Sequence, residues 1–160
     1  MIKVNIEVKN KSWNKKLKNP KRYFNKKLKK ISKNIKFFKN RNITFTILLT
    51  NSLYMKKLNK KFRKINKPTD VLSFPFFKEK NLKLLKQKKI YIGDVAMSYE
   101  IINSRAKKNN FFVEFDKVWV HGFLHLLGYD HKKKKDFEKM KKIEDFILNN
   151  LYKKIDKKNK

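Results

Sequence analysis

The sequence contains no cysteine, which excludes disulfide bonds and thiolate ligands, so any metal site must use histidine and carboxylate side chains. Glycine and proline are scarce, with three of each among 160 residues, so most turns must be made by asparagine, aspartate, serine and lysine. No apolar run approaches the roughly 20 residues that a helix needs to cross a bilayer. The first residues also lack the apolar core of a signal peptide. We therefore expect a soluble cytoplasmic protein.

Acidic residues are few, since 13 Asp and Glu stand against 45 Lys and Arg and give a formal net charge of +32. Self-repulsion of this size favours a polyanionic partner, and nucleic acid gains the entropy of released counterions when cations neutralise its phosphates. Codon bias is an alternative explanation. All basic residues but four are lysine, and Lys, Asn, Ile and Phe are all abundant, as an AT-rich genome would encode. The charge therefore permits RNA or DNA binding without proving it.

The pattern of apolar residues predicts one α+β domain over residues 1–152, followed by a basic tail over residues 153–160. Strict alternation of apolar and polar residues indicates strands, and apolar residues three or four apart indicate helices. The predicted strands cover residues 2–8, 43–49, 71–76 and 90–97. The predicted helices cover residues 20–38, about 52–62, 98–108, 113–127 and 134–148. We find no repeat and no linker that would divide the chain.

Individual residues refine these boundaries. Ser52 and Ser98 are candidate N-terminal caps of helices. Pro75 favours an edge strand or a strand end, and Gly93 indicates a bulge or a close backbone approach. Gly128 is expected to adopt the left-handed conformation just after a helix.

All the histidines of the chain lie in the segment HGFLHLLGYDH of residues 121–131, and we call His121, His125 and His131 the histidine cluster. His121 and His125 are four residues apart, so on a helix they share one face and their imidazoles can converge on one ion. Gly128 lets the chain turn back so that His131 can supply a third nitrogen. Three protein ligands leave a fourth position for water, which is typical of a catalytic zinc. The cluster therefore predicts one Zn²⁺ used for hydrolysis.

The spacing resembles the H-E-x-x-H motif of metalloproteases, but position 122 is glycine. The glutamate that acts as general base in those enzymes is missing, which argues against a protease. Asp130 has two readings: an acceptor for the N–H of a metal-binding histidine, or an ordinary turn residue.

The histidine segment resembles the signature of the YbeY endoribonucleases, which are rRNA maturation factors. Residues 58–63 (LNKKFR), 67–76 (KPTDVLSFPF) and 92–95 (IGDV) resemble further blocks of that family in the family's order. Met140 and Glu144 lie where the family's last helix carries such residues. The chain departs from the family in its lysine-rich surface and in a variant strand end at residues 95–98.

The resemblance implies a small mixed β-sheet flanked by helices, with the metal site at the end of a central helix. It implies a zinc-dependent, single-strand-specific endoribonuclease acting in 3′-end maturation of 16S rRNA and in ribosome quality control. The family's ligands fall on His121, His125 and His131, and its functional arginine falls on Arg63. One Zn²⁺ per chain, an rRNA precursor and the small ribosomal subunit are the implied cofactor and partners. The planar guanidinium of Arg63 suits bidentate contact with a phosphate. The residue by itself favours a helix-end surface arginine, and the resemblance reverses that reading.

Two other functions stay open at this point: a non-enzymatic rRNA or small-subunit assembly factor with a structural zinc, and a metal hydrolase of another substrate such as a peptide. Trp119 and Phe123 are expected to pack in the core. The connector at residues 78–89 is either a solvated loop or a track for an RNA backbone. Asp70 and Asp94 are either catalytic acids or turn and cap residues.

Overall fold

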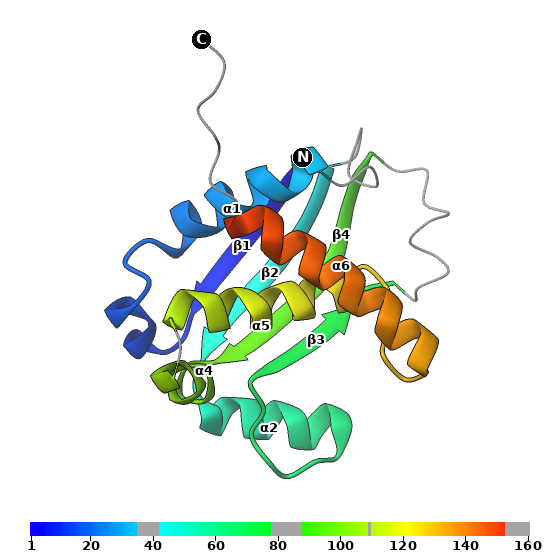
Figure 1. The fold of residues 1–160 in the computed structure, drawn as a ribbon. Helices are drawn as coiled ribbons and strands as arrows, with labels where there is room; N and C mark the ends of the chain where they lie inside the picture. Colours follow the sequence, from blue (N-terminus) through cyan, green and yellow to red (C-terminus); the bar gives the residue numbers. More distant parts are fainter. Residues whose placement is uncertain (35–41, 78–87, 109, 153–160) are drawn as a thin grey trace.

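A computed structural model describes residues 1–34, 42–77, 88–108 and 110–152 of the chain. Within these residues a four-stranded sheet has the order β1-β2-β4-β3 (Figure 1). The strands are β1 (Ile2–Val8), β2 (Asn42–Thr50), β3 (Val71–Pro75) and β4 (Lys89–Ser98). The first three in spatial order are parallel, and β3 pairs antiparallel with β4. The sheet is mixed, which confirms the predicted α+β class, and Pro75 ends an edge strand as its missing N–H requires.

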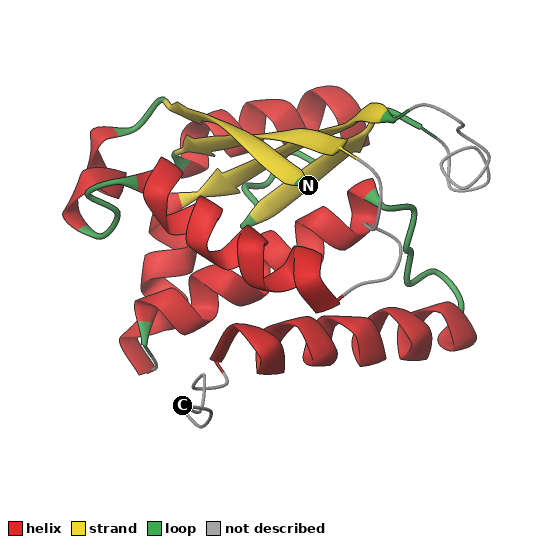
Figure 2. Cartoon of the chain, turned by 90° about the horizontal axis from the view of Figure 1, so that it is seen from above, coloured by secondary structure: helices red, strands yellow, loops and turns green. Residues whose placement is uncertain are grey.

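Helices cover the sheet unequally. The bounds are α1 (Pro20–Asn34), α2 (Ser52–Arg63), α4 (Tyr99–Arg105), α5 (Phe111–Leu126) and α6 (Lys134–Tyr152), with short 3₁₀ turns η1 (Lys11–Lys15) and η3 (Ala106–Lys108). Helices α1 and α5 pack on one face of the sheet, and α6 packs on both of them on the side away from the strands (Figure 2). Helix α2 lies on the other face, against β3 and β4.

The alternation of β2 explains this arrangement. Its inward residues Ile43, Phe45, Ile47 and Leu49 are all essentially buried in the main core, beneath α1 and α5. Trp119 and Phe123 of α5 are also fully buried, as expected, and the Phe123 ring lies 5.0 Å from that of Phe45. A smaller apolar cluster beneath α2 contains Met55, Leu72 and Ala96.

One fully buried carboxylate holds the three helices of the covered face together. Asp116 of α5 accepts hydrogen bonds from Tyr23 Oη at 2.7 Å, Trp119 Nε1 at 2.7 Å and Tyr152 Oη at 2.6 Å, and it forms an ion pair with Lys27 at 2.6 Å. Burial, followed by the nearby carboxylate, raises the pKa of both tyrosines. Because Tyr152 is on α6 and Tyr23 on α1, Asp116 fixes both helices against α5.

One of the two cap assignments was wrong, and the other holds for the position but not for the side chain: Ser98 is the N-cap residue of α4. Asn51, rather than Ser52, caps α2 by accepting a hydrogen bond from the Tyr54 N–H at 2.8 Å. Ser98 stands at the start of α4 but makes no side-chain cap bond there. The two serine hydroxyls instead lie 2.8 Å from each other, and both donate to Glu100.

Gly93 lies where β3 and β4 approach each other closely, as predicted. Gly93 has φ +126°, and a Cβ there would lie 2.1 Å from the Phe74 carbonyl oxygen, which is the close approach expected.

Helix α6 extends to Tyr152, beyond the predicted end at residue 148. Residues 35–38 of the first predicted helix, residues 78–87 of the connector and the 153–160 tail lie outside the described residues. Among the described helices, none combines the length and apolar composition that a membrane-spanning segment requires.

Candidate metal centre

The end of α5 brings the histidine cluster together. His121 and His125 occupy the last turns of the helix, and Gly128 follows with φ +84°. The Gly128 N–H donates to the His125 carbonyl and the Tyr129 N–H donates to the Leu124 carbonyl, both at 3.0 Å. This pair of bonds is the Schellman arrangement that a left-handed residue permits. The chain therefore reverses direction as predicted, and His131 returns to the same end of the helix.

The three imidazoles share one small volume. One ring nitrogen from each histidine lies within 4.8 Å of the others. The Nε2 atoms of His121 and His125 are 3.2 Å apart. Tetrahedral zinc with Zn–N bonds of 2.0–2.1 Å separates its ligand nitrogens by about 3.3 Å, so this pair already has the spacing of two zinc ligands. The donor set and its spacing fit a zinc ion.

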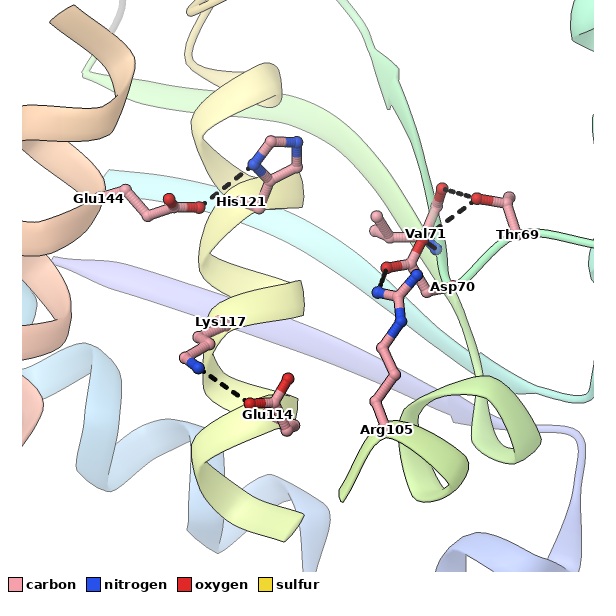
Figure 3. A network of polar contacts seen from close by, with 8 residues as sticks. All are labelled: Thr69, Asp70, Val71, Arg105, Glu114, Lys117, His121 and Glu144. Atoms are coloured by element: carbon pink, nitrogen blue, oxygen red, sulfur yellow. Dashed lines mark hydrogen bonds and ion pairs between the residues drawn. The ribbon is translucent and has the colours of Figure 1, made fainter. Parts of the chain in front are cut away.

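A carboxylate on α6 orients one of the rings. Glu144 Oε1 lies 3.2 Å from His121 Nδ1, and the two side chains point toward each other across the helix pair (Figure 3). When Nδ1 carries the proton and donates a hydrogen bond to Glu144, the lone pair on Nε2 faces the cluster, as a metal ligand requires. Burial raises the pKa of Glu144, but the hydrogen bonds and charges of His121 and Lys141 outweigh it and lower that pKa overall.

The electrostatics of the cluster favour the ligand form of histidine. Burial, and then the charges of His121 and His131, lower the pKa of His125, while a backbone hydrogen bond at Tyr129 acts in the opposite direction. The neutral imidazole is the form that binds a metal. Burial and the neighbouring histidines therefore favour the neutral form of His125, which can bind a metal ion.

The histidine cluster opens into a pocket of about 920 Å³. This volume is near the upper end of those typical of ligand sites. Arg63, the last residue of α2, lines the same pocket, so the predicted arginine and the predicted ligands border one pocket although they belong to different elements. Asp70 and Phe76, at the two ends of β3, line it as well.

The aspartates that the sequence left open all have hydrogen-bond or ion-pair partners within the protein. Asp70 accepts the Val71 N–H at 2.9 Å and pairs with Arg105, which are the contacts of a strand-start cap (Figure 3). Asp94 accepts a hydrogen bond from the Tyr91 hydroxyl. Asp130 accepts the backbone N–H of His131 at 2.8 Å and pairs with Lys132, which favours its turn reading.

Position 122 faces the sheet and not the pocket. The Gly122 carbonyl accepts a hydrogen bond from the Ser73 hydroxyl at 3.0 Å, and a Cβ at this position would lie 2.7 Å from Val95 Cγ1. A glutamate there would be buried against β3 and β4. The general-base position of the H-E-x-x-H motif is therefore unavailable in this helix packing.

Sequence reasoning missed the role of Glu144. Its only signal was its place in the resemblance, because the contact with His121 spans 23 positions and depends on how α6 crosses α5. The exposed ring of Phe76 beside the pocket was also missed, since alternation assigns it only to a strand end.

Comparison with known proteins gives a consistent match. The sequence model described as Endoribonuclease YbeY matches residues 5–152. A Pelagibacter ubique protein of that name is 50% identical over 151 residues, covering 92% of this chain and 94% of that protein. A Caldicellulosiruptor bescii protein of the same name is 36% identical over 122 residues, covering 72% and 77%. A solution structure from Thermotoga maritima aligns with a TM-score of 0.58 and 26% identity, covering 99% of this chain and all of that one.

Proposed function

This chain belongs to the YbeY endoribonuclease family, and we propose that it is a zinc-dependent endoribonuclease that cleaves single-stranded RNA. The observation that carries the proposal is the convergence of three imidazoles at the wall of a pocket that Arg63 also lines. Three nitrogen ligands from the protein leave one position for water or substrate, which is the pattern of a catalytic zinc site.

Each residue of the site has a distinct part in this proposal. His121, His125 and His131 hold one Zn²⁺ per chain, which when bound would supply Lewis-acid activation of water or of a phosphate oxygen. Glu144 keeps the His121 proton on Nδ1 and so leaves Nε2 free for the ion. Arg63 binds the scissile phosphate through its planar guanidinium and stabilises the charge that develops during cleavage.

The substrate we propose is a precursor of 16S rRNA, cleaved at its 3′ end, with the small ribosomal subunit as partner. Ribosome quality control and a cytoplasmic location belong to the same proposal. Support comes from the names of the relatives, which are endoribonucleases, and from the formal net charge of +32, which suits a large polyanionic assembly.

The decisive experiment compares the zinc-loaded wild-type chain with the His121→Ala variant on matched single-stranded and duplex RNA. We expect wild type to cleave the single strand, and the variant to lose both cleavage and bound zinc while keeping its circular dichroism spectrum. Chelation should abolish wild-type cleavage and added zinc should restore it. Undiminished cleavage by a folded His121→Ala variant would overturn the catalytic role. Normal rRNA maturation in cells carrying that variant would favour the assembly factor instead.

A further inference from the structure

We propose that Phe76 is a base-stacking platform, on which a nucleobase next to the cleaved phosphodiester packs while the backbone enters the pocket. The inference rests on the proposed function and adds to it a residue that recognises the substrate. It also offers a physical reason for a preference for single strands.

Phe76 is the most exposed aromatic side chain among the residues that the structure describes. Its exposed fraction is 67%, although Trp13, Phe24, Phe45, Phe115 and Phe123 are fully buried. The ring lines the pocket that also contains the histidine cluster and Arg63. A large aromatic surface left in water beside candidate phosphate-binding groups is a feature of sites that bind unpaired bases.

The backbone that carries this ring is held firmly. The Phe76 N–H donates to the Ile92 carbonyl at 3.0 Å, just after Pro75 pairs with Gly93 at the end of β3. A Cβ at Gly93 would lie 3.0 Å from the Phe76 nitrogen, so glycine is what allows the two strands to approach here. The ring also makes edge-type contacts with Phe77 and Tyr91, at centroid distances of 5.0 and 5.9 Å. Phe76 is therefore an anchored aromatic rather than a free loop residue.

The expected ligand is an unpaired nucleobase of any identity. Every base has a π-face, so stacking on an aromatic side chain tolerates sequence variation and contributes about 5- to 150-fold in affinity per base. In a duplex both faces of a base are already covered by its neighbours. A base can reach Phe76 only when its strand is unpaired, so the ring and Arg63 together select base and phosphate of a single strand.

The test measures binding of a short labelled single-stranded RNA in the His121→Ala background, where cleavage is not expected. Phe76→Ala and Phe76→Trp are compared with their parent, and an abasic nucleotide is moved along the RNA one position at a time. Phe137→Ala is the matched control, because Phe137 is a 54% exposed phenylalanine on α6 that does not line the pocket.

We expect Phe76→Ala to raise the dissociation constant about 5- to 150-fold, while Phe76→Trp and Phe137→Ala stay within about twofold of the parent. At one position of the RNA, an abasic nucleotide should raise the dissociation constant of the parent by a similar factor. The same abasic nucleotide should not raise the dissociation constant of Phe76→Ala any further. The proposal is overturned if Phe76→Ala binds RNA as tightly as the parent does. It is also overturned if, at every position tested, an abasic nucleotide weakens binding to Phe76→Ala as much as it weakens binding to the parent.

Cleavage by chains with intact histidines is measured separately. If wild type cleaves RNA and Phe76→Ala is indistinguishable from its parent in binding, the platform is wrong and the proposed function stands. If wild type cleaves no RNA but the loss at Phe76 coincides with one abasic position, the platform stands and the proposed activity is wrong.

Discussion

Glu144 Oε1 on α6 lies 3.2 Å from His121 Nδ1 on α5, so a residue 23 positions along the chain orients a candidate metal ligand. The contact makes the metal site depend on the packing of two helices as well as on the histidine motif. The buried carboxylate of Asp116 reinforces this dependence, because it binds Tyr152 at the far end of the same helix.

The first prediction concerns this orienting contact. Glu144→Ala should weaken zinc binding about 10- to 100-fold, since loss of such an outer partner frees the ring and its tautomer. Glu144→Gln, which keeps an acceptor oxygen, should lose less. Zinc affinity is measured by competition with a chromophoric chelator. Asp145→Ala is the control, because Asp145 is adjacent and pairs with the same Lys141. Equal zinc affinities of Glu144→Ala and Asp145→Ala would contradict the orienting role.

The second prediction concerns Arg63. Arg63→Lys keeps the charge but loses the planar pair of donors, so the catalytic efficiency of RNA cleavage should fall about 10²- to 10³-fold. Zinc affinity should not change, because the arginine is not a ligand in the proposal. Arg22→Lys, an arginine-to-lysine exchange on an exposed part of α1, should leave both quantities unchanged. A parallel loss of zinc would mean that Arg63 supports the fold of the site rather than the substrate.

The third prediction concerns Gly122. In the interior of a helix, alanine is normally more stabilising than glycine by about 1 kcal/mol. At this position the new methyl group would meet Val95 Cγ1 at 2.7 Å and Ser73 Oγ at 3.2 Å, so α5 must move away from the sheet. We expect Gly122→Ala to lower the free energy of unfolding by about 1–3 kcal/mol, measured with urea. An increase in stability would show that α5 does not sit this close to β3 and β4.

The fourth prediction concerns the buried ion pair between Asp116 and Lys27. Asp116→Ala leaves a largely buried ammonium group without its partner, which should cost about 3–5 kcal/mol of unfolding free energy. Adding Lys27→Met should recover part of that loss, and a double-mutant cycle by urea denaturation measures how much. Full additivity of the two losses would mean that the residues do not interact.

The fifth prediction concerns pH and Glu100. Its carboxylate accepts hydrogen bonds from the Ser52 N–H at 2.8 Å and from the Ser52 and Ser98 hydroxyls. Burial raises the pKa of Glu100, but a hydrogen bond from its own backbone N–H, together with the bonds from Ser52 and Ser98, outweighs burial and lowers the pKa below its ordinary value. A carboxyl group whose pKa is lower in the folded state stabilises the fold above its unfolded pKa, and this stability is lost as the pH falls through the folded value.

Glu100→Gln should therefore be less stable than wild type at neutral pH, and the difference should shrink as the pH falls below about 4.5. Urea unfolding at several pH values gives this difference directly. A difference that stays constant over the whole range would assign the effect to packing rather than to the charge.

Much of the fold could be predicted because its signals are local. All four strands were predicted to within one residue at each end. In β1 and β2 the signal was the alternation of buried with more exposed residues, which is a property of neighbouring positions. The reversal at Gly128 was also predicted, because a left-handed glycine after a helix is a property of adjacent residues. The N-cap of α2 was not predicted correctly, because Ser52 forms hydrogen bonds with Ser98 and Glu100, which are distant in the chain.

The amino-acid sequence by itself determined the histidine pair on one helix face, the third histidine after the turn, and the family to which the chain belongs. These follow from spacings of a few residues, which backbone geometry converts directly into positions. Only the tertiary structure decided that Glu144 orients His121, that Arg63 and Phe76 line the pocket, and that position 122 faces the sheet. Such relationships depend on which helix faces meet, and that is set by the packing of the whole core rather than by any segment of it.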